Sequence, residues 1–78
     1  MSKIDHAFWD GTQVVIVLSS GQKNKCKSSN FTSGSHEVAG CNVNGDEIHV
    51  LTKTKGMTKV QRCHIVSKHG QYKGSKSI

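Results

Sequence analysis

The chain has 78 residues, a formal net charge of +6 and no proline. A chain of this length buries only roughly 60% of its unfolded surface, which leaves room for one small core and argues against a deep active-site cavity. Eight Val and five Ile against two Leu and two Ala favour strands over helices, and they exclude a helical bundle or a coiled coil.

Residues 1–11 carry two of the four aromatic side chains and end in the turn signal Asp10-Gly11. The pattern predicts a short lead-in segment with one helical turn that begins at Asp5. Its rings, Phe8 and Trp9, are expected to cover one end of the core.

The strongest predicted strand is Thr12–Leu18, in which apolar residues occupy both faces. Val14, Ile16 and Leu18 share one face, and two further valines make the other face apolar too. A strand that is apolar on both faces should be the most buried one, and Phe8 and Trp9 would cover its second face. The segment is far too short to cross a membrane as a helix.

A long polar segment, Gln22–Ser35, follows and is predicted to be a loop in which Phe31 anchors the chain to the core. Two interpretations of its lysines stay open. In the first, Lys23, Lys25 and Lys27 lie on a flexible loop and contact a partner. In the second, the loop is only solvent-exposed and its lysines keep it soluble.

The dipeptide Asn44-Gly45 predicts a two-residue β-hairpin with a type I′ turn. If Val43 and Asp46 flank this turn, Cys41 lies opposite Ile48. One face of the hairpin is then the predicted core, made of Ala39, Cys41, Val43, Ile48 and Val50. The other face combines polar and apolar side chains and is predicted to be largely solvent-exposed. It is made of Asn42, Glu47, His49, Leu51, Lys53 and Lys55.

After the hairpin, the sequence predicts a turn at Gly56 and a short strand over Met57–Gln61. An irregular or 3₁₀ corner over Arg62–His64 and a last strand over Ile65–Ser67 are predicted to follow. Residues 68–78 are expected to form a flexible basic tail with frayed structure. The domain therefore spans residues 12–67. Its fold class is all-β, a small barrel of four to five short antiparallel strands that closes on itself and so removes exposed edges.

Three stretches resemble the KOW motif and the later strands of SH3-like barrels: Gly11–Lys25 (GTQVVIVLSSGQKNK), Gly45–Val50 (GDEIHV) and Val60–Ile65 (VQRCHI). The stretch departs from that motif at Asn24–Lys27, where a second glycine is typical. The resemblance implies an SH3-like barrel that binds RNA, DNA or a component of transcription or translation without catalysis. It also implies that contacts come from the loop at Gln22–Lys27. In size and style the chain is similar to small phage-encoded regulatory proteins.

The cysteines and histidines give little support to metal or enzyme chemistry. Cys26, Cys41 and Cys63 are an odd number without the Cys-x-x-Cys pairing of structural zinc sites. Cys63 and His64 are adjacent, so in a strand they point to opposite faces. We therefore expect no cofactor, no metal and no catalytic residue. The start at Met1–Lys3 lacks the apolar stretch of a signal peptide, which favours the cytoplasm, or the host cytoplasm if the chain is phage-encoded.

The basic surface is the best candidate for function, since residues 40–78 carry seven Lys or Arg against two acids. The predicted binding residues are Lys23, Lys25, Lys27, His49, Lys53, Lys55, Lys59 and Arg62. Lysine suits phosphate, and one Arg among eleven basic residues argues for low sequence specificity. The alternative is a module or inhibitor that docks its basic face on an acidic host protein, such as a transcription or nucleoid component. Either form would be a monomer or a weak homodimer, with no membrane partner and no small-molecule substrate.

Overall fold

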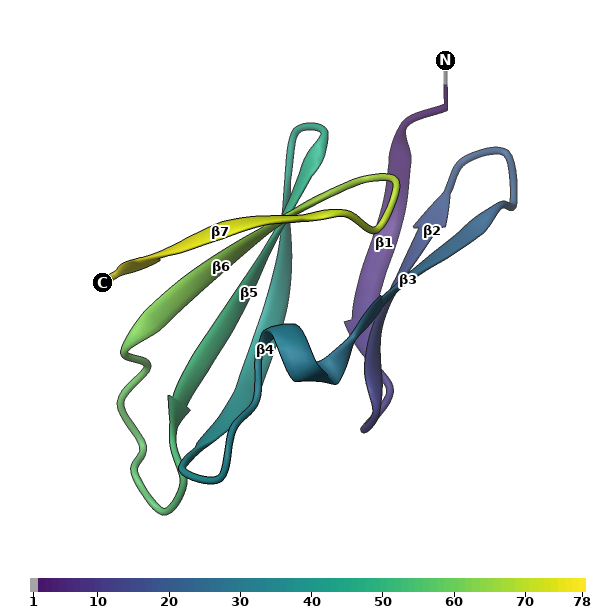
Figure 1. Ribbon diagram of the computed structural model, residues 1–78. Helices are drawn as coiled ribbons and strands as arrows, with labels where there is room; N and C mark the ends of the chain where they lie inside the picture. The colour runs from purple at the N-terminus through teal and green to yellow at the C-terminus, as the bar shows by residue number, and fades with distance from the viewer. Residues whose placement is uncertain (1) are drawn as a thin grey trace.

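The strands form two antiparallel sheets in the computed structural model, which describes residues 2–78 (Figure 1). The first sheet holds β1 (Ile4–Trp9), β2 (Gln13–Leu18) and β3 (Lys23–Lys27), in that order. A short 3₁₀ helix, η1 (Ser28–Asn30), leads to the second sheet. That sheet holds β4 (His36–Asn44), β5 (Glu47–Thr54), β6 (Arg62–Ser67) and β7 (Tyr72–Ser77). The predicted all-β class is confirmed.

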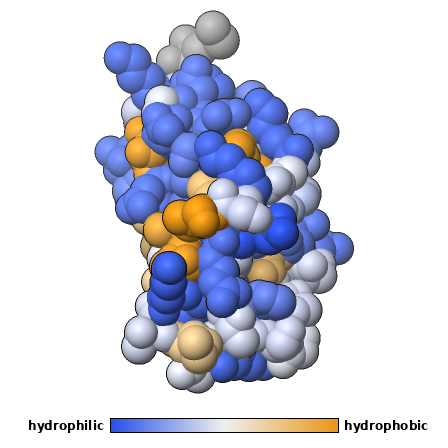
Figure 2. Space-filling view, turned by 90° about the vertical axis from the view of Figure 1, so that its left-hand side faces the viewer, coloured by the Kyte–Doolittle hydropathy of each residue, from blue (hydrophilic) through white to orange (hydrophobic). Residues whose placement is uncertain are grey.

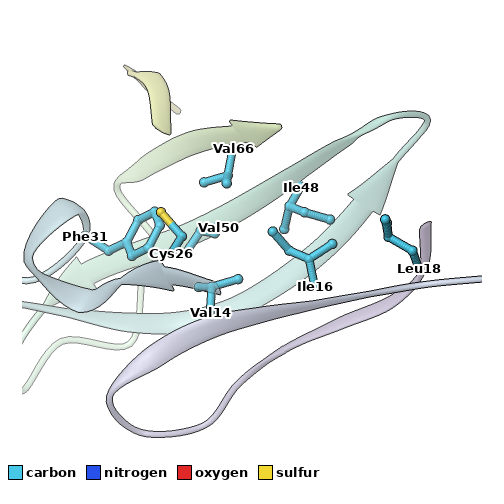
Figure 3. Packing of buried hydrophobic residues seen from close by; sticks show 8 residues of the cluster. All are labelled: Val14, Ile16, Leu18, Cys26, Phe31, Ile48, Val50 and Val66. Atoms are coloured by element: carbon cyan, nitrogen blue, oxygen red, sulfur yellow. The ribbon is translucent and has the colours of Figure 1, made fainter. Parts of the chain in front are cut away.

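The core lies between the two sheets. Val14, Ile16 and Leu18 of β2 point at Ile48 and Val50 of β5 (Figure 3). Val66 of β6, Cys26 of β3 and Phe31 after η1 complete the buried cluster. Four of the six residues of β2 are buried, which confirms that it is the most buried strand.

The segment before β2 is a strand and not the predicted lead-in with a helical turn. From Ile4 onward it pairs with β2, with a bulge at Asp5, while Met1 lies outside the described residues. Trp9 packs against the core opposite Val14, but Phe8 lies opposite Val15 on the outer face and is 44% exposed. Sequence analysis missed this strand because its strongest support lies outside the segment itself. The buried strand β2 needs hydrogen-bonding partners along both of its edges, and residues 4–9 supply one of them.

Asp10 closes the turn between β1 and β2, as the Asp10-Gly11 signal predicts. Its carboxylate accepts hydrogen bonds from the backbone N–H groups of Thr12 and Gln13, at 2.7 and 2.8 Å. These backbone donors hold the pKa of the Asp10 carboxyl below its usual value.

The predicted long loop at Gln22–Ser35 is also wrong in its first part, where Lys23–Lys27 form β3 along the other edge of β2. The three lysines point outward and are exposed, while Cys26 between them is buried in the core. Asn24 points inward too, and its side-chain amide donates to the Lys68 carbonyl oxygen at 2.8 Å. The strand reads as a loop in sequence because its inward residues are few and one is polar.

The hairpin between β4 and β5 exists, but its register is two residues away from the predicted one. Cys41 lies opposite Val50 and Asn44 opposite Glu47, so the turn residues are Gly45 and Asp46. Gly45 has φ +63°, and no residue other than glycine has a positive φ within 2–78. Those signs fit a type II′ turn and not type I′. A shift of two keeps the side chains from Gly40 to Val50 on their predicted faces.

Burial within this hairpin follows the prediction only in part. Ile48 and Val50 are fully buried, whereas Val43 near the tip is 43% exposed. The register shifts between Val38 and Gly40, where Ala39 forms a bulge and is exposed. Bulges bend a strand, and this one falls in the longest strand of the second sheet.

The C-terminal third corrects three further predictions. Residues 57–61 form no strand, and Met57 is 52% exposed. The predicted corner at Arg62–His64 is the first half of β6. The predicted frayed tail contains β7, which pairs with β6 through Tyr72–Ser77.

No strand of one sheet pairs with a strand of the other, so residues 2–78 show no closed barrel. They approach at both sides of the sandwich: β1 lies beside β4, and the turn between β6 and β7 lies against β3. The side that faces left in Figure 1 is mostly hydrophilic, with small separate apolar patches (Figure 2).

Gly70 is expected to be the more sensitive of two turn glycines with positive φ. A Cβ at Gly70 (φ +87°) would lie 2.8 Å from the Lys25 carbonyl oxygen, whereas at Gly45 it would meet nothing within 4 Å. Gly45→Ala should cost about 1 kcal/mol for its backbone conformation alone. Gly70→Ala should cost at least about 2 kcal/mol, because the turn must also move away from β3. Urea unfolding of both variants measures the difference, and equal losses would contradict the close approach.

Candidate nucleic-acid interface

The outer face of the first sheet carries three parallel rows of side chains. On β3 are Lys23, Lys25 and Lys27, which we call the lysine row. The strand registers place Val17 and Val15 beside Lys23 and Lys25, and then His6 and Phe8 of β1 beside those valines. We call His6 and Phe8 the aromatic pair. Strand alternation produces this face, because the intervening residues of all three strands point into the core.

The lysine row has no charge partner among residues 2–78: no carboxylate lies within 4 Å of its ammonium groups. All five acidic side chains of the chain are bonded to groups other than the lysine row. Asp5 bonds to His6 and Asp10 to the turn before β2, while the other three pair with lysines: Glu37 with Lys53, Asp46 with Lys68, and Glu47 with Lys73. The face of β3 is therefore uncompensated positive charge on a paired strand.

The remaining predicted binding residues lie elsewhere. His49 and Lys53 are on the outer face of the second sheet, where Lys53 pairs with Glu37 at 3.6 Å. Lys55 is in the turn after β5, and Lys59 is in the segment before β6. Because the outer faces of the two sheets point away from each other, the structure does not bring these residues together with the lysine row.

Arg62 also departs from the predicted surface. It lies at the start of β6, opposite Thr52 of β5, and its guanidinium donates to Ser75 Oγ at 2.9 Å. It lines a pocket at one end of the core instead of the outer faces.

The exposed aromatic residue is one that sequence analysis placed in the core. Phe31 is 3% exposed, as expected for a residue that anchors its segment to the core, and packs edge-on against Tyr72 and His64. Phe8 is the exposed ring, roughly parallel to His6 at 6.0 Å between centroids. The signal that could have found it is the alternation of His6 and Phe8 with Ala7 and Trp9, which is a strand pattern.

The pocket near Arg62 has a volume of about 210 Å³ and is lined by residues 30–33 and by β4, β5 and β6 of the second sheet. Its lining includes Phe31, His36, Thr52, Arg62 and His64 and contains no carboxylate and no thiol. His64 is hydrogen-bonded at both ring nitrogens, by Nε2 to Thr52 Oγ1 at 3.0 Å and by Nδ1 to Tyr72 Oη at 2.9 Å. Burial lowers the pKa of His64, and the positive charges of Arg62 and His36 lower it further.

The cysteines are free and separated. Cys26 and Cys41 have thiol pKa values raised by burial, which opposes formation of a nucleophilic thiolate. Cys63 and His64 lie on opposite faces of β6, as adjacent strand residues must. No group of three or more His, Cys, Asp or Glu side chains in residues 2–78 is arranged to hold a metal ion.

Comparison with protein families, with curated proteins and with solved structures found no match to this chain. In the part of the chain that the structure describes, no helix has the length and apolar character needed to span a bilayer.

His64 should make stability fall as the pH drops below about 6.5, its ordinary pKa. The unfolded chain takes up a proton there while the folded imidazole, with its lowered pKa, stays neutral, so the contribution is complete above that pH and is lost below it. His64→Gln should cost about 1–2 kcal/mol at pH 8 and flatten the dependence between about pH 7 and 5. Thermal unfolding across this range, with exposed His69→Gln as the control, measures the effect. An unchanged slope in His64→Gln would contradict it.

Proposed function

We propose that this protein is a non-catalytic nucleic-acid-binding protein that contacts the phosphate backbone with the lysine row, as a monomer or weak homodimer. The supporting observation is the alignment of Lys23, Lys25 and Lys27 on one face, while every acidic side chain is bonded to a group other than these lysines. Three fixed positive charges without partners are a poor arrangement for stability, since like charges repel. A polyanion supplies the missing charge.

The spacing of the row also suits a chain of phosphates. Alternate residues on a strand are about 7 Å apart, comparable to the spacing of successive phosphates in an extended strand. Ammonium groups bind phosphate as point charges, while reading of base edges prefers the arginine fork. Because Arg62 is bonded to Ser75 away from this face, we propose low sequence specificity.

The fold type and cellular role belong to this proposal as well. We propose an SH3-like, KOW-related fold with a role in transcription or translation, or as a phage regulator. Its support is that the KOW-like stretch 11–25 covers β2 and the first part of β3 and contains two members of the lysine row, Lys23 and Lys25. Small, strongly bent antiparallel sheets are common to that class of domain.

The second candidate is a module or inhibitor that docks the same face on an acidic host protein. The observation in its favour is that Val17 and the exposed Phe8 accompany the lysines on this face. Interfaces between proteins combine aromatic residues with a charged rim. The two candidates share a surface and differ in the partner.

Reversal of the row should remove nucleic-acid binding. The test compares K23E/K25E/K27E with K55E/K59E/K76E, whose lysines are exposed and lie away from this face. Each substitution lowers the charge by two, so both variants have a formal net charge of zero, from +6. The wild type should bind labelled oligonucleotides with a log–log salt slope of about −2, as expected for three phosphates of a single strand. The first variant should lose at least about tenfold in affinity and the control much less.

Anisotropy titrations at several salt concentrations give affinity and slope together. Equal losses in both variants would show a diffuse effect of net charge and would contradict a site on β3. An absence of binding to DNA and RNA, together with a partner captured from nuclease-treated lysate by the wild type but not by K23E/K25E/K27E, would favour the second candidate.

A further inference from the structure

We infer that the ligand of this face is single-stranded nucleic acid, with a nucleobase stacked on Phe8 while phosphates follow the lysine row. The inference depends on the proposed function and adds to it the strandedness of the ligand and a base-binding residue. It is carried by the position of Phe8, which lies on the same face as the lysines and is 44% exposed.

The rows have the dimensions of a nucleotide. β1 and β3 flank β2 on opposite sides, so their outward side chains are about 10 Å apart, two strand spacings. This distance is comparable to the reach from a phosphate to the base that it carries. Phe8, Val15 and Lys25 lie in register across the three strands, so one nucleotide can place its phosphate at Lys25 and its base at Phe8.

The strip between the two rows is apolar. It holds Val15, which is 5% exposed beneath its neighbours, and the partly exposed Val17, which is the valine that a sugar or the edge of a base can contact. The nearest carboxylate on β1, Asp5, lies at the bulge and bonds to His6 at 2.7 Å. His6 lies roughly parallel to Phe8 and supports that ring from one side.

Stacking on Phe8 requires an unpaired base. In a duplex both faces of each base are covered by its neighbours, so a duplex can offer this sheet only its phosphates. Single strands leave base faces open, and aromatic side chains beside a basic track are the usual way in which proteins bind them without sequence preference.

The test measures binding of a labelled oligo-dT of about 12 nucleotides and of a duplex of the same length. Wild type should prefer the single strand. Phe8→Leu keeps an apolar cover over Val15 but removes the aromatic ring, and it should weaken oligo-dT binding about tenfold with an unchanged salt slope. Phe8→Trp should retain wild-type affinity. Met57→Ala, which truncates an exposed apolar side chain in the segment between β5 and β6, is the matched control and should bind normally.

The outcomes separate this inference from the function on which it depends. If Phe8→Leu binds oligo-dT as tightly as wild type, or if duplex and single strand bind equally, the stacking site is wrong, although lysine reversal can still establish a phosphate-binding surface. If wild type binds neither ligand, the proposed function itself fails. Weakened oligo-dT binding in Phe8→Leu, restored by Phe8→Trp, would support the site.

Discussion

The packing of β2 against the second sheet is the constraint on which the rest of the structure depends. Val14 and Ile16 are fully buried against Ile48 and Val50, and a chain of 78 residues has enough apolar side chains for only one such core. A strand buried this deeply must have its backbone N–H and C=O groups paired along both edges. β1 and β3 meet that need, so their presence follows from the burial of β2 more than from their own sequences.

The candidate site is a consequence of the same constraint. When the inward residues of β1, β2 and β3 are held by the core, their alternate residues form one continuous outer face. Lysines on β3 and the aromatic pair on β1 are thereby held on a paired, three-stranded support, where the positions of the charges are set by the strand spacing. The carboxylates are used in turns and in ion pairs elsewhere, mostly on the second sheet. One end of the core is closed by His64, which is hydrogen-bonded to Thr52 and Tyr72 and so joins β5, β6 and β7.

Prediction from sequence succeeded where a segment's own side chains supply its stability. β2 was recognised from its unbroken apolar run. Ile48 and Val50 were placed correctly because side chains alternate between the two faces of a strand, and a shift of two residues in register leaves each on the same face. It failed for β1, β3 and β7, which are polar or lie at sheet edges and gain their stability from a partner strand far along the chain. The turn at Gly45-Asp46 was misplaced because Asn44-Gly45 and Gly45-Asp46 are both acceptable turn pairs, and the bulge at Ala39 lies in the pairing between strands.

By itself, the sequence determined the all-β class, the residues of the central strand, the surplus of lysine and the identity of Lys23, Lys25 and Lys27 as candidates for binding. These follow from side-chain chemistry and local periodicity. Only the tertiary structure decided that these three lysines form a row and that His49 and Lys53 lie on the other sheet. It also decided that Phe8 is exposed while Phe31 is buried. The reason is that the face on which a strand residue lies depends on which strands pair and which side packs on the core, and both are set by contacts between distant segments.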